Sequence, residues 1–231
     1  MTTTMGTAMT GSHLPGPLER RAQTFSGRSV SVLRDMVLSG LLSPGQRLNE
    51  VELARALEIS RGPLREAIQR LASEGLLTIV SHRGAYVRTF DAGELRDLYE
   101  LRVALETHAV RLAAERLTAD DVADVGGLLD ETREVLAAAD DRAYPEELDF
   151  HRRIVALTGN QALLGATVEV LRQIHLARSR SGQQPRRARD AYDEHRAVVD
   201  HVAAGDGEAA ALLMRGHLYR SLDNALRIFE A

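Results

Sequence analysis

Apolar residues recur every three or four positions over most of this chain, which is the spacing of one face of an α-helix. The first such segment runs from Ser26 to Ser39 and ends at Gly40. A short helix then begins at Asn49, and another begins after Ser60, with only a tight turn between them. Two short helices joined in this way are typical of a helix-turn-helix.

The helical spacing is interrupted after Gly75, a residue that suits the end of the second short helix. The stretches 76–80 and 85–90 are rich in β-formers, and the turn 81–84 separates them. This pattern predicts a hairpin with a basic tip, packed beside the helix pair. Residues 25–90 are therefore predicted to form a winged helix-turn-helix.

The second helix of the pair is basic at its start. Arg61, Arg65 and Gln69 lie on one stripe, opposite an apolar one. Arginines in the first turn of such a helix can reach guanine edges or phosphates in the major groove. A single pair of arginines is usually a solvated surface feature, but the cap, tight turn and basic hairpin together favour DNA. The candidate DNA-binding residues are Ser60, Arg61, Gly62, Arg65, Gln69, His82, Arg83 and Gly84.

From Asp91 onward the helical pattern continues to the end of the chain. Six amphipathic helices are predicted, the second interrupted at Gly126-Gly127, over residues 91–116, 119–139, 145–157, 161–179, 186–204 and 208–229. Short connections between such helices predict an antiparallel bundle. The predicted fold is mainly α: an N-terminal winged helix-turn-helix followed by an all-α bundle over 91–231, preceded by a disordered arm over 1–24.

The charge is divided between these two parts. The net charge of the 231-residue chain is −4, but residues up to Phe90 contain 11 arginines and 7 acids, against 18 and 26 in the remainder. Basic and acidic parts of this kind are expected when a DNA-binding domain is joined to a domain with another task. The chain has no cysteine, no apolar run of membrane-spanning length and no signal pattern, so we expect a cytoplasmic protein without a membrane partner.

Three of the eight histidines fall on predicted bundle helices in suggestive positions. His151 has Glu147 four residues earlier on the same helix face, and His195 and His217 lie on the last two helices. If these helices share a centre, three imidazoles and a carboxylate suit zinc, nickel or another divalent transition metal. By spacing alone, separate histidines on the surface or with a single hydrogen bond are the stronger interpretation.

Residues 26–90 resemble the DNA-binding domain of GntR-family bacterial transcription regulators. The matching stretches are Leu42-Ser43-Pro44-Gly45, Ser60-Arg61-Gly62-Pro63-Leu64-Arg65-Glu66-Ala67, Glu74-Gly75-Leu76 and Arg83-Gly84. Ser43 is an insertion, and Gly62 stands where a threonine is common, which would forfeit one hydroxyl contact to a phosphate.

Residues 91–231 resemble the FCD effector domain of the FadR-like branch of that family. The matching stretches are Tyr99-Glu100-Leu101-Arg102, Leu105-Glu106, Phe150-His151, Gly159-Asn160, Glu194-His195-Arg196 and Arg215-Gly216-His217-Leu218. The resemblance implies a metal held by His151, His195 and His217. Glu147 takes the place of the family aspartate, and nearby Asp149 is expected to face elsewhere. Arg102 matches an arginine that faces the effector cavity, although by sequence alone an ordinary surface or helix-pairing arginine is an equally good interpretation. Six helices imply the shorter VanR-like subtype.

Together these features predict a ligand-responsive transcription regulator, with repression favoured, that binds a pseudo-palindromic operator as a homodimer. A small organic acid is expected to bind beside the metal and Arg102, since a guanidinium can hold a carboxylate with two hydrogen bonds. One alternative is a metalloenzyme built on the three histidines and the carboxylate. Another is a metal-free acyl-CoA sensor. Turnover assays and metal analysis separate the three.

Overall fold

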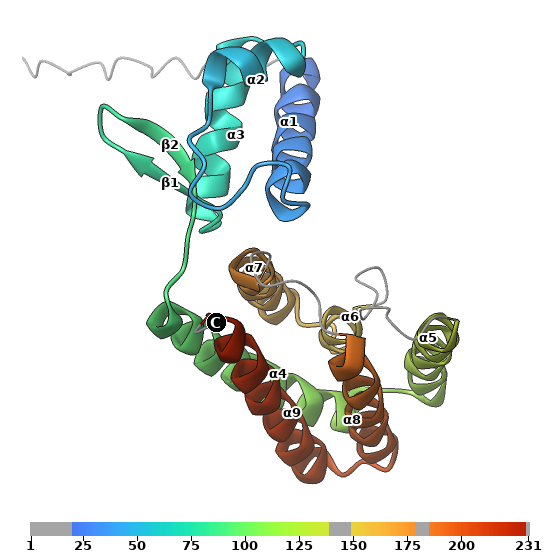
Figure 1. Ribbon diagram of the computed structural model, residues 1–231. Helices are drawn as coiled ribbons and strands as arrows, with labels where there is room; N and C mark the ends of the chain where they lie inside the picture. The colour runs from blue at the N-terminus through green and yellow to red at the C-terminus, as the bar shows by residue number, and fades with distance from the viewer. Residues whose placement is uncertain (1–19, 139–148, 179–184, 230–231) are drawn as a thin grey trace, which may run out of the picture.

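The first three helices and a two-stranded hairpin form the upper unit of the molecule in Figure 1. The computed structural model describes residues 20–138, 149–178 and 185–229. The elements of this unit are α1 (Arg20–Leu38), α2 (Glu50–Ala56), α3 (Arg61–Ser73), β1 (Leu77–Val80) and β2 (Gly84–Val87). The strands are antiparallel, with Leu77 opposite Val87 and Val80 opposite Gly84. The predicted winged helix-turn-helix is confirmed.

Helix α1 begins earlier than the sequence pattern suggests. Residues 20–24 were assigned to a disordered arm, but α1 starts at Arg20. Arginine, alanine and glutamine in this stretch are good helix formers, and the last proline before it is Pro17, so no residue there breaks the helix. Residues 1–19, the rest of the predicted arm, lie outside the described residues.

The caps of the helix pair follow from the sequence with one exception. The side chain of Asn49 accepts hydrogen bonds from the backbone of Val51 and Glu52, and Gly75 has a positive φ of 73° directly after the end of α3. Ser60 occupies the N-cap position of α3 but makes no side-chain cap bond. The usual donor is the N–H of the third helical residue, which here is Pro63 and has none. The hydroxyl is thus not used to cap α3.

The lower unit is the predicted helical bundle. Its described helices are α4 (Ala92–Arg116), α5 (Ala119–Ala137), α6 (Phe150–Leu157), α7 (Gln161–Arg178), α8 (Pro185–Ala203) and α9 (Gly207–Phe229). Helices α4 and α9 lie side by side, and α8 packs on α9 (Figure 1). The interruption predicted at Gly126-Gly127 is wrong: α5 is continuous, because the buried Val125 and Leu129 hold its inner face against the bundle. The helix predicted over 145–157 is wrong at its start: α6 begins at Phe150, because Asp149 is extended and caps it. Pro145 itself and the polar loop from Ser181 lie outside the described residues.

Two apolar cores organise the chain. The first core contains residues from both units, including Leu33, Leu64 and Leu71 of the winged unit and Val170 and Ile174 of α7. The second core lies wholly within the bundle and contains residues of all six of its described helices, including Leu163 near the start of α7. Helix α7 therefore contributes its second half to the core of the winged unit.

Polar contacts reinforce this junction at the end of α3. Glu74 is buried, and its carboxylate accepts two hydrogen bonds from Arg34 at 3.0 and 2.9 Å. Arg70 also donates to it at 3.1 Å, and Arg172 of α7 lies 3.8 Å away. Burial raises the pKa of Glu74, but the Arg34 guanidinium and its neighbours outweigh burial and hold the pKa below its usual range. One carboxylate thus binds three arginines from both units.

Glu74→Gln is expected to lower the free energy of unfolding at pH 7 by about 1.5–3 kcal/mol, because charge-assisted bonds are lost and the arginines are left without their counter-charge. The pKa of Glu74 is lower in the folded than in the unfolded chain, so its contribution is complete above the unfolded value of 4.5. That contribution disappears as the pH falls through the folded value. Urea denaturation at a series of pH values from 7 to 3.5 should show that the free energy of unfolding falls less steeply with decreasing pH for the variant than for the wild type.

The matched control for this experiment is Glu134→Gln, which changes an exposed carboxylate of α5. A surface change of this kind should leave stability within about 0.5 kcal/mol of the wild type. A Glu74→Gln protein as stable as this control at pH 7 would show that the arginine cluster contributes nothing to the junction.

One further property of the described residues concerns membranes. None of their helices combines the length and the apolar character that crossing a bilayer requires.

Candidate metal centre and DNA-binding surface

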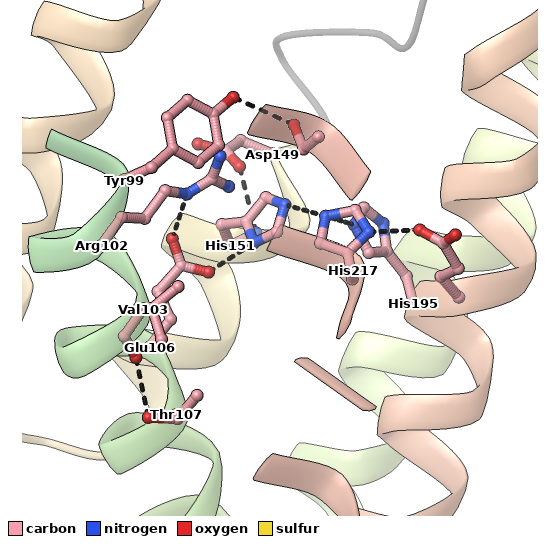
Figure 2. A network of polar contacts seen from close by, with 11 residues as sticks. Tyr99, Arg102, Val103, Glu106, Thr107, Asp149, His151, His195 and His217 are labelled. Atoms are coloured by element: carbon pink, nitrogen blue, oxygen red, sulfur yellow. Dashed lines mark hydrogen bonds and ion pairs between the residues drawn. The ribbon is translucent and has the colours of Figure 1, made fainter. Parts of the chain in front are cut away.

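Three helices of the bundle bring His151, His195 and His217 together. The residues lie on α6, α8 and α9, and one ring nitrogen of each lies within 4.8 Å of the other two (Figure 2). The Nε2 atom of His217 is 3.3 Å from Nε2 of His195 and 3.2 Å from Nε2 of His151. His195 and His217 are buried. The structure thus joins the three histidines that the sequence analysis selected.

The outer nitrogens of two rings are bound by carboxylates. Nδ1 of His151 lies 2.6 Å from Oε2 of Glu106, and Nδ1 of His217 lies 2.6 Å from Oε2 of Glu194. An ionised carboxylate only accepts hydrogen bonds, so each Nδ1 carries the hydrogen and donates it. A neutral imidazole with Nδ1 protonated has its lone pair on Nε2, the atom that faces the other rings.

Each carboxylate is held in turn by an arginine. Arg102 donates from Nε to Glu106 at 2.6 Å, one turn away on α4, and Arg220 donates from Nε to Glu194 at 2.6 Å. The third ring, that of His195, stacks on Phe150 with centroids 4.2 Å apart. All three imidazoles are therefore fixed by neighbouring side chains rather than by each other alone.

The electrostatics keep His217 neutral and Glu106 ionised. Burial lowers the pKa of His217 to about 3, and the charges of His151 and Arg102 act in the same direction. Burial raises the pKa of Glu106, but Arg102 and His151 outweigh it and hold that pKa well below its ordinary value. At neutral pH His217 is thus uncharged, as a metal ligand must be.

The donor set fits a divalent transition metal. Two imidazole nitrogens bound to a tetrahedral zinc at 2.0–2.1 Å lie about 3.4 Å apart, close to the two Nε2 separations in this cluster. Histidines whose second nitrogen donates to a carboxylate are the usual arrangement around protein-bound metals. The three histidines can therefore hold a metal ion.

Two acidic residues precede His151 in the sequence, and the structure describes only the second of them. Glu147, the predicted carboxylate ligand, lies outside the described residues. Asp149 is the N-cap of α6, and its side chain accepts from the backbone N–H of His151 at 3.0 Å. Because Asp149 precedes the helix, its direction is set by capping rather than by a helix face. The expectation that Asp149 faces away from the cluster is therefore wrong: its carboxylate lies beside the His151 ring and Arg102 in Figure 2.

Arg102, the predicted effector-binding residue, is buried on α4 next to the cluster. Its guanidinium lies 5.5 Å from the centroid of Tyr99, whose hydroxyl is 3.0 Å from Ser221 of α9. Figure 2 shows polar contacts from Arg102 through Glu106 to His151 and on to His217. The Nε edge of the guanidinium is thus hydrogen-bonded to Glu106, and the side chain of Arg102 is buried in the bundle interior.

The predicted DNA-binding residues of α3 lie on its outer face. Arg61, Arg65 and Gln69 are exposed, whereas Leu64 and Ile68 face the core. Arg65 donates from Nε to Glu50 of α2 at 3.0 Å, in a pair that is itself exposed. Gly62 is also exposed, and a Cβ there would meet open space. This face of α3 presents cations to solvent.

The hairpin tip carries the remaining candidates. His82 and Arg83 are exposed, and His82 has a positive φ of 59°, followed by Gly84 at 98°. The left-handed conformation at His82 helps to bring the chain back over the three residues 81–83 and places both side chains at the end of the hairpin. In Figure 1 the hairpin extends to one side of α3.

Sequence reasoning missed the residues that orient the cluster. Glu106 and Glu194 lie in stretches that resemble the FCD domain, but the sequence pattern assigns neither of them a role. For Glu106 a signal exists: it follows Arg102 by four residues, which places the pair on one helix face. Glu194 and Phe150 are each adjacent to a histidine in sequence, yet both contact the ring of a histidine on another helix.

Two family patterns match the chain. The pattern described as "Bacterial regulatory proteins, gntR family" matches residues 29–87, and that of the FCD domain matches residues 97–220. The two matches correspond to the winged unit and to most of the bundle.

Curated relatives and solved structures agree with these patterns. The chain is 37% identical to the Nta operon transcriptional regulator of Aminobacter aminovorans, over 84% of this chain and 91% of the relative. It is 32% identical to a probable D-xylose utilization operon transcriptional repressor of Paenarthrobacter nicotinovorans, over 81% and 84%. The fold is similar to E. coli McbR/YncC (TM-score 0.74, 22% identity, 88% and 97% covered). It is also similar to a putative GntR transcriptional regulator from Rhodococcus sp. RHA1 (TM-score 0.69, 25% identity, 88% and 98% covered).

Proposed function

The chain belongs to the GntR family of bacterial regulatory proteins and carries an FCD domain, and from this premise we propose that it is a repressor that binds its operator as a homodimer and responds to a small organic acid. It is a transcription regulator rather than an enzyme, since the matching families and relatives are regulators. The metalloenzyme alternative is therefore not supported. The observation that carries the proposal is the convergence of three imidazoles beside a buried arginine in the bundle.

DNA recognition is assigned to α3 and the hairpin. We place the first turn of α3 in the major groove, where Arg61 and Arg65 reach base edges or phosphates and Gln69 lies one turn further along. Ser60, whose hydroxyl does not cap the helix, and the backbone at Gly62 approach a phosphate. His82, Arg83 and Gly84 contact the backbone beside the groove. Each protomer has one such helix, so two half-sites supply the affinity and specificity of an operator.

The effector site is assigned to the bundle interior. His151, His195 and His217 would hold a zinc, nickel or similar divalent ion, with Glu147 in the position of the family's carboxylate ligand. Such an ion supplies positive charge and an open coordination position for an anionic ligand. Arg102 supplies a second cation and binds a carboxylate of the effector, while its Nε keeps Glu106 in place. Two cations make an anion-binding pocket possible in a domain whose net charge is negative.

The signal from this site is expected to pass through α7. This helix packs against α4 and α6, which carry Arg102 and His151, and its second half contacts the winged unit. His175 lies 3.0 Å from the carbonyl of Leu38, and Arg88 donates to Gln173. An effector that binds one arrangement of these helices better than another shifts the winged units of the dimer relative to each other.

A metal-free acyl-CoA sensor is the remaining alternative within the family. Three converging histidines, two of them oriented by carboxylates, argue against it, because such an arrangement has a use as a metal site and no evident use in binding a thioester. The six helices of the described bundle agree with the VanR-like subtype.

The full-length protein is expected to sediment as a dimer and to protect two symmetric half-sites separated by one or two turns of DNA, about 34 Å or a multiple of it. Addition of the effector should release it from the operator. Analytical ultracentrifugation, hydroxyl-radical footprinting and titration with candidate acids measure these three properties. A monomer that protects a single unsymmetric site would contradict the dimeric part of the proposal, and an operator complex indifferent to small acids would contradict the sensing part.

A further inference from the structure

A band of polar side chains separates the two apolar cores of the bundle. Along α4, Leu95 and Tyr99 belong to the first core and Ala109 to the second, with Arg102 and Glu106 between them. Along α9, Leu218 belongs to the second core and Leu222 to the first, with Ser221 between them. His151, which contacts Glu106, and the adjoining rings of His195 and His217 complete this polar layer.

Helix α7 crosses the same boundary at Thr167. Leu163 belongs to the second core and Val170 to the first, so the side chain between them lies at the level of the polar layer. Thr167 is 1% exposed, and α7 packs against both α4 and α6. Thr167 is therefore buried on the helix that packs against those carrying Arg102 and His151.

The Thr167 hydroxyl has no hydrogen-bond partner, which sets it apart from every other buried side-chain polar atom of the described residues. Two other threonines of the bundle form a hydrogen bond within their own helix: Thr107 of α4 donates to the carbonyl of Val103, and Thr132 of α5 donates to that of Leu128. Thr167 forgoes this bond, and an enclosed hydroxyl without a partner costs about 1–3 kcal/mol. Such an atom indicates a polar partner that is absent from the protein itself.

We propose that Thr167 binds the effector directly and helps to determine its specificity, with its hydroxyl donating a hydrogen bond to an oxygen of the small organic acid. This inference rests on the proposed function, because it takes the effector to be an acid that enters the polar layer. Arg102 attracts the acid by charge, whereas Thr167 forms a directional bond on the opposite helix. The same helix contacts the winged unit at Gln173 and His175, less than three turns further on, so ligand binding acts on the element that joins the two units.

Thr167→Val removes the hydroxyl while keeping a similar shape, and Thr167→Ser keeps the hydroxyl. Thr132→Val is the matched control, since Thr132 is equally buried but already bonded within its own helix. The metal-loaded, full-length proteins are titrated with acetate, malonate, malate and citrate by calorimetry. The tightest acid is expected to bind Thr167→Val roughly 10- to 100-fold more weakly than wild type, and to bind the other two variants within about threefold of wild type. Without ligand, Thr167→Val should raise the melting temperature relative to Thr132→Val, because it alone removes an unsatisfied group.

Three outcomes count against the inference in different ways. A Thr167→Val protein that binds the acid like wild type would leave the effector site in place and overturn the role of Thr167, whose partner is then a water molecule. Ligand-free melting of Thr167→Val below that of Thr132→Val would show that the hydroxyl is already satisfied, and would also overturn it. If no acid of the series binds metal-loaded wild type, the acid effector of the proposed function fails and this inference fails with it.

Discussion

Replacing His195 by alanine is expected to remove most of the bound divalent metal from the full-length protein and to abolish its response to effector. Three imidazoles converge in the bundle, and loss of one leaves two nitrogens that cannot complete a stable site. Changing an orienting residue alone typically costs 10- to 100-fold in metal affinity, so loss of a ligand should cost more than about 100-fold. Operator binding without effector should persist, because all three histidines lie outside the winged unit.

Elemental analysis after growth in metal-supplemented medium measures occupancy, and titration of the operator complex with effector measures the response. His201→Ala is the matched control: His201 lies on the same helix but is half-exposed and outside the cluster. Two results would disprove the site. One is a wild-type protein free of metal after such growth, and the other is a His195→Ala protein with an unchanged effector response.

The double substitution Arg61→Ala, Arg65→Ala is expected to weaken operator binding by about 2–5 kcal/mol at moderate salt, since each arginine that contacts a base or phosphate contributes about 1–3 kcal/mol. The dependence of affinity on salt should also become less steep, because fewer counterions are released. In the free protein Arg65 already pairs with Glu50, so the net gain in free energy when Arg65 contacts DNA is smaller. Fluorescence anisotropy with operator DNA over a range of salt concentrations measures both effects.

Arg133→Ala serves as the control for charge, because Arg133 is an exposed arginine of α5 in the bundle. It should leave affinity and salt dependence unchanged. If the double variant binds operator as tightly as Arg133→Ala does, α3 is not the element that enters the groove.

The parts of the fold that were predicted correctly are those with local signals. Asn49, Asp91 and Thr118 each cap the helix that follows, and Gly75 ends α3 with a positive φ. These features depend on residues within a few positions of each other, so they can be recognised in the chain itself. The interruption expected at Gly126-Gly127 fails for the opposite reason, because packing decides whether a weak helical segment is kept. The early start of α1 reflects the helix propensity of residues 20–24, which the spacing of apolar residues does not register.

The candidate site shows the same division. The three histidines were selected by residue type and by family resemblance, and the structure brings them together. Glu106, Glu194 and Phe150 act across helices that are distant in sequence, and no periodicity encodes which ring each one contacts. The unpaired hydroxyl of Thr167 is defined only by what surrounds it. The roles assigned to the DNA-binding residues, Arg102 and Glu147 stay predictions.

The core shared by the winged unit and α7 bears on how this protein can change. Leu33 and Leu71 belong to the same apolar core as Val170 and Ile174, so the two units are expected to unfold cooperatively rather than as separate modules. A chimera that joins this winged unit to a foreign sensor would expose that apolar surface unless the new helix were repacked to cover it. New sensing specificities are thus more accessible through substitutions inside the bundle than through recombination at the boundary.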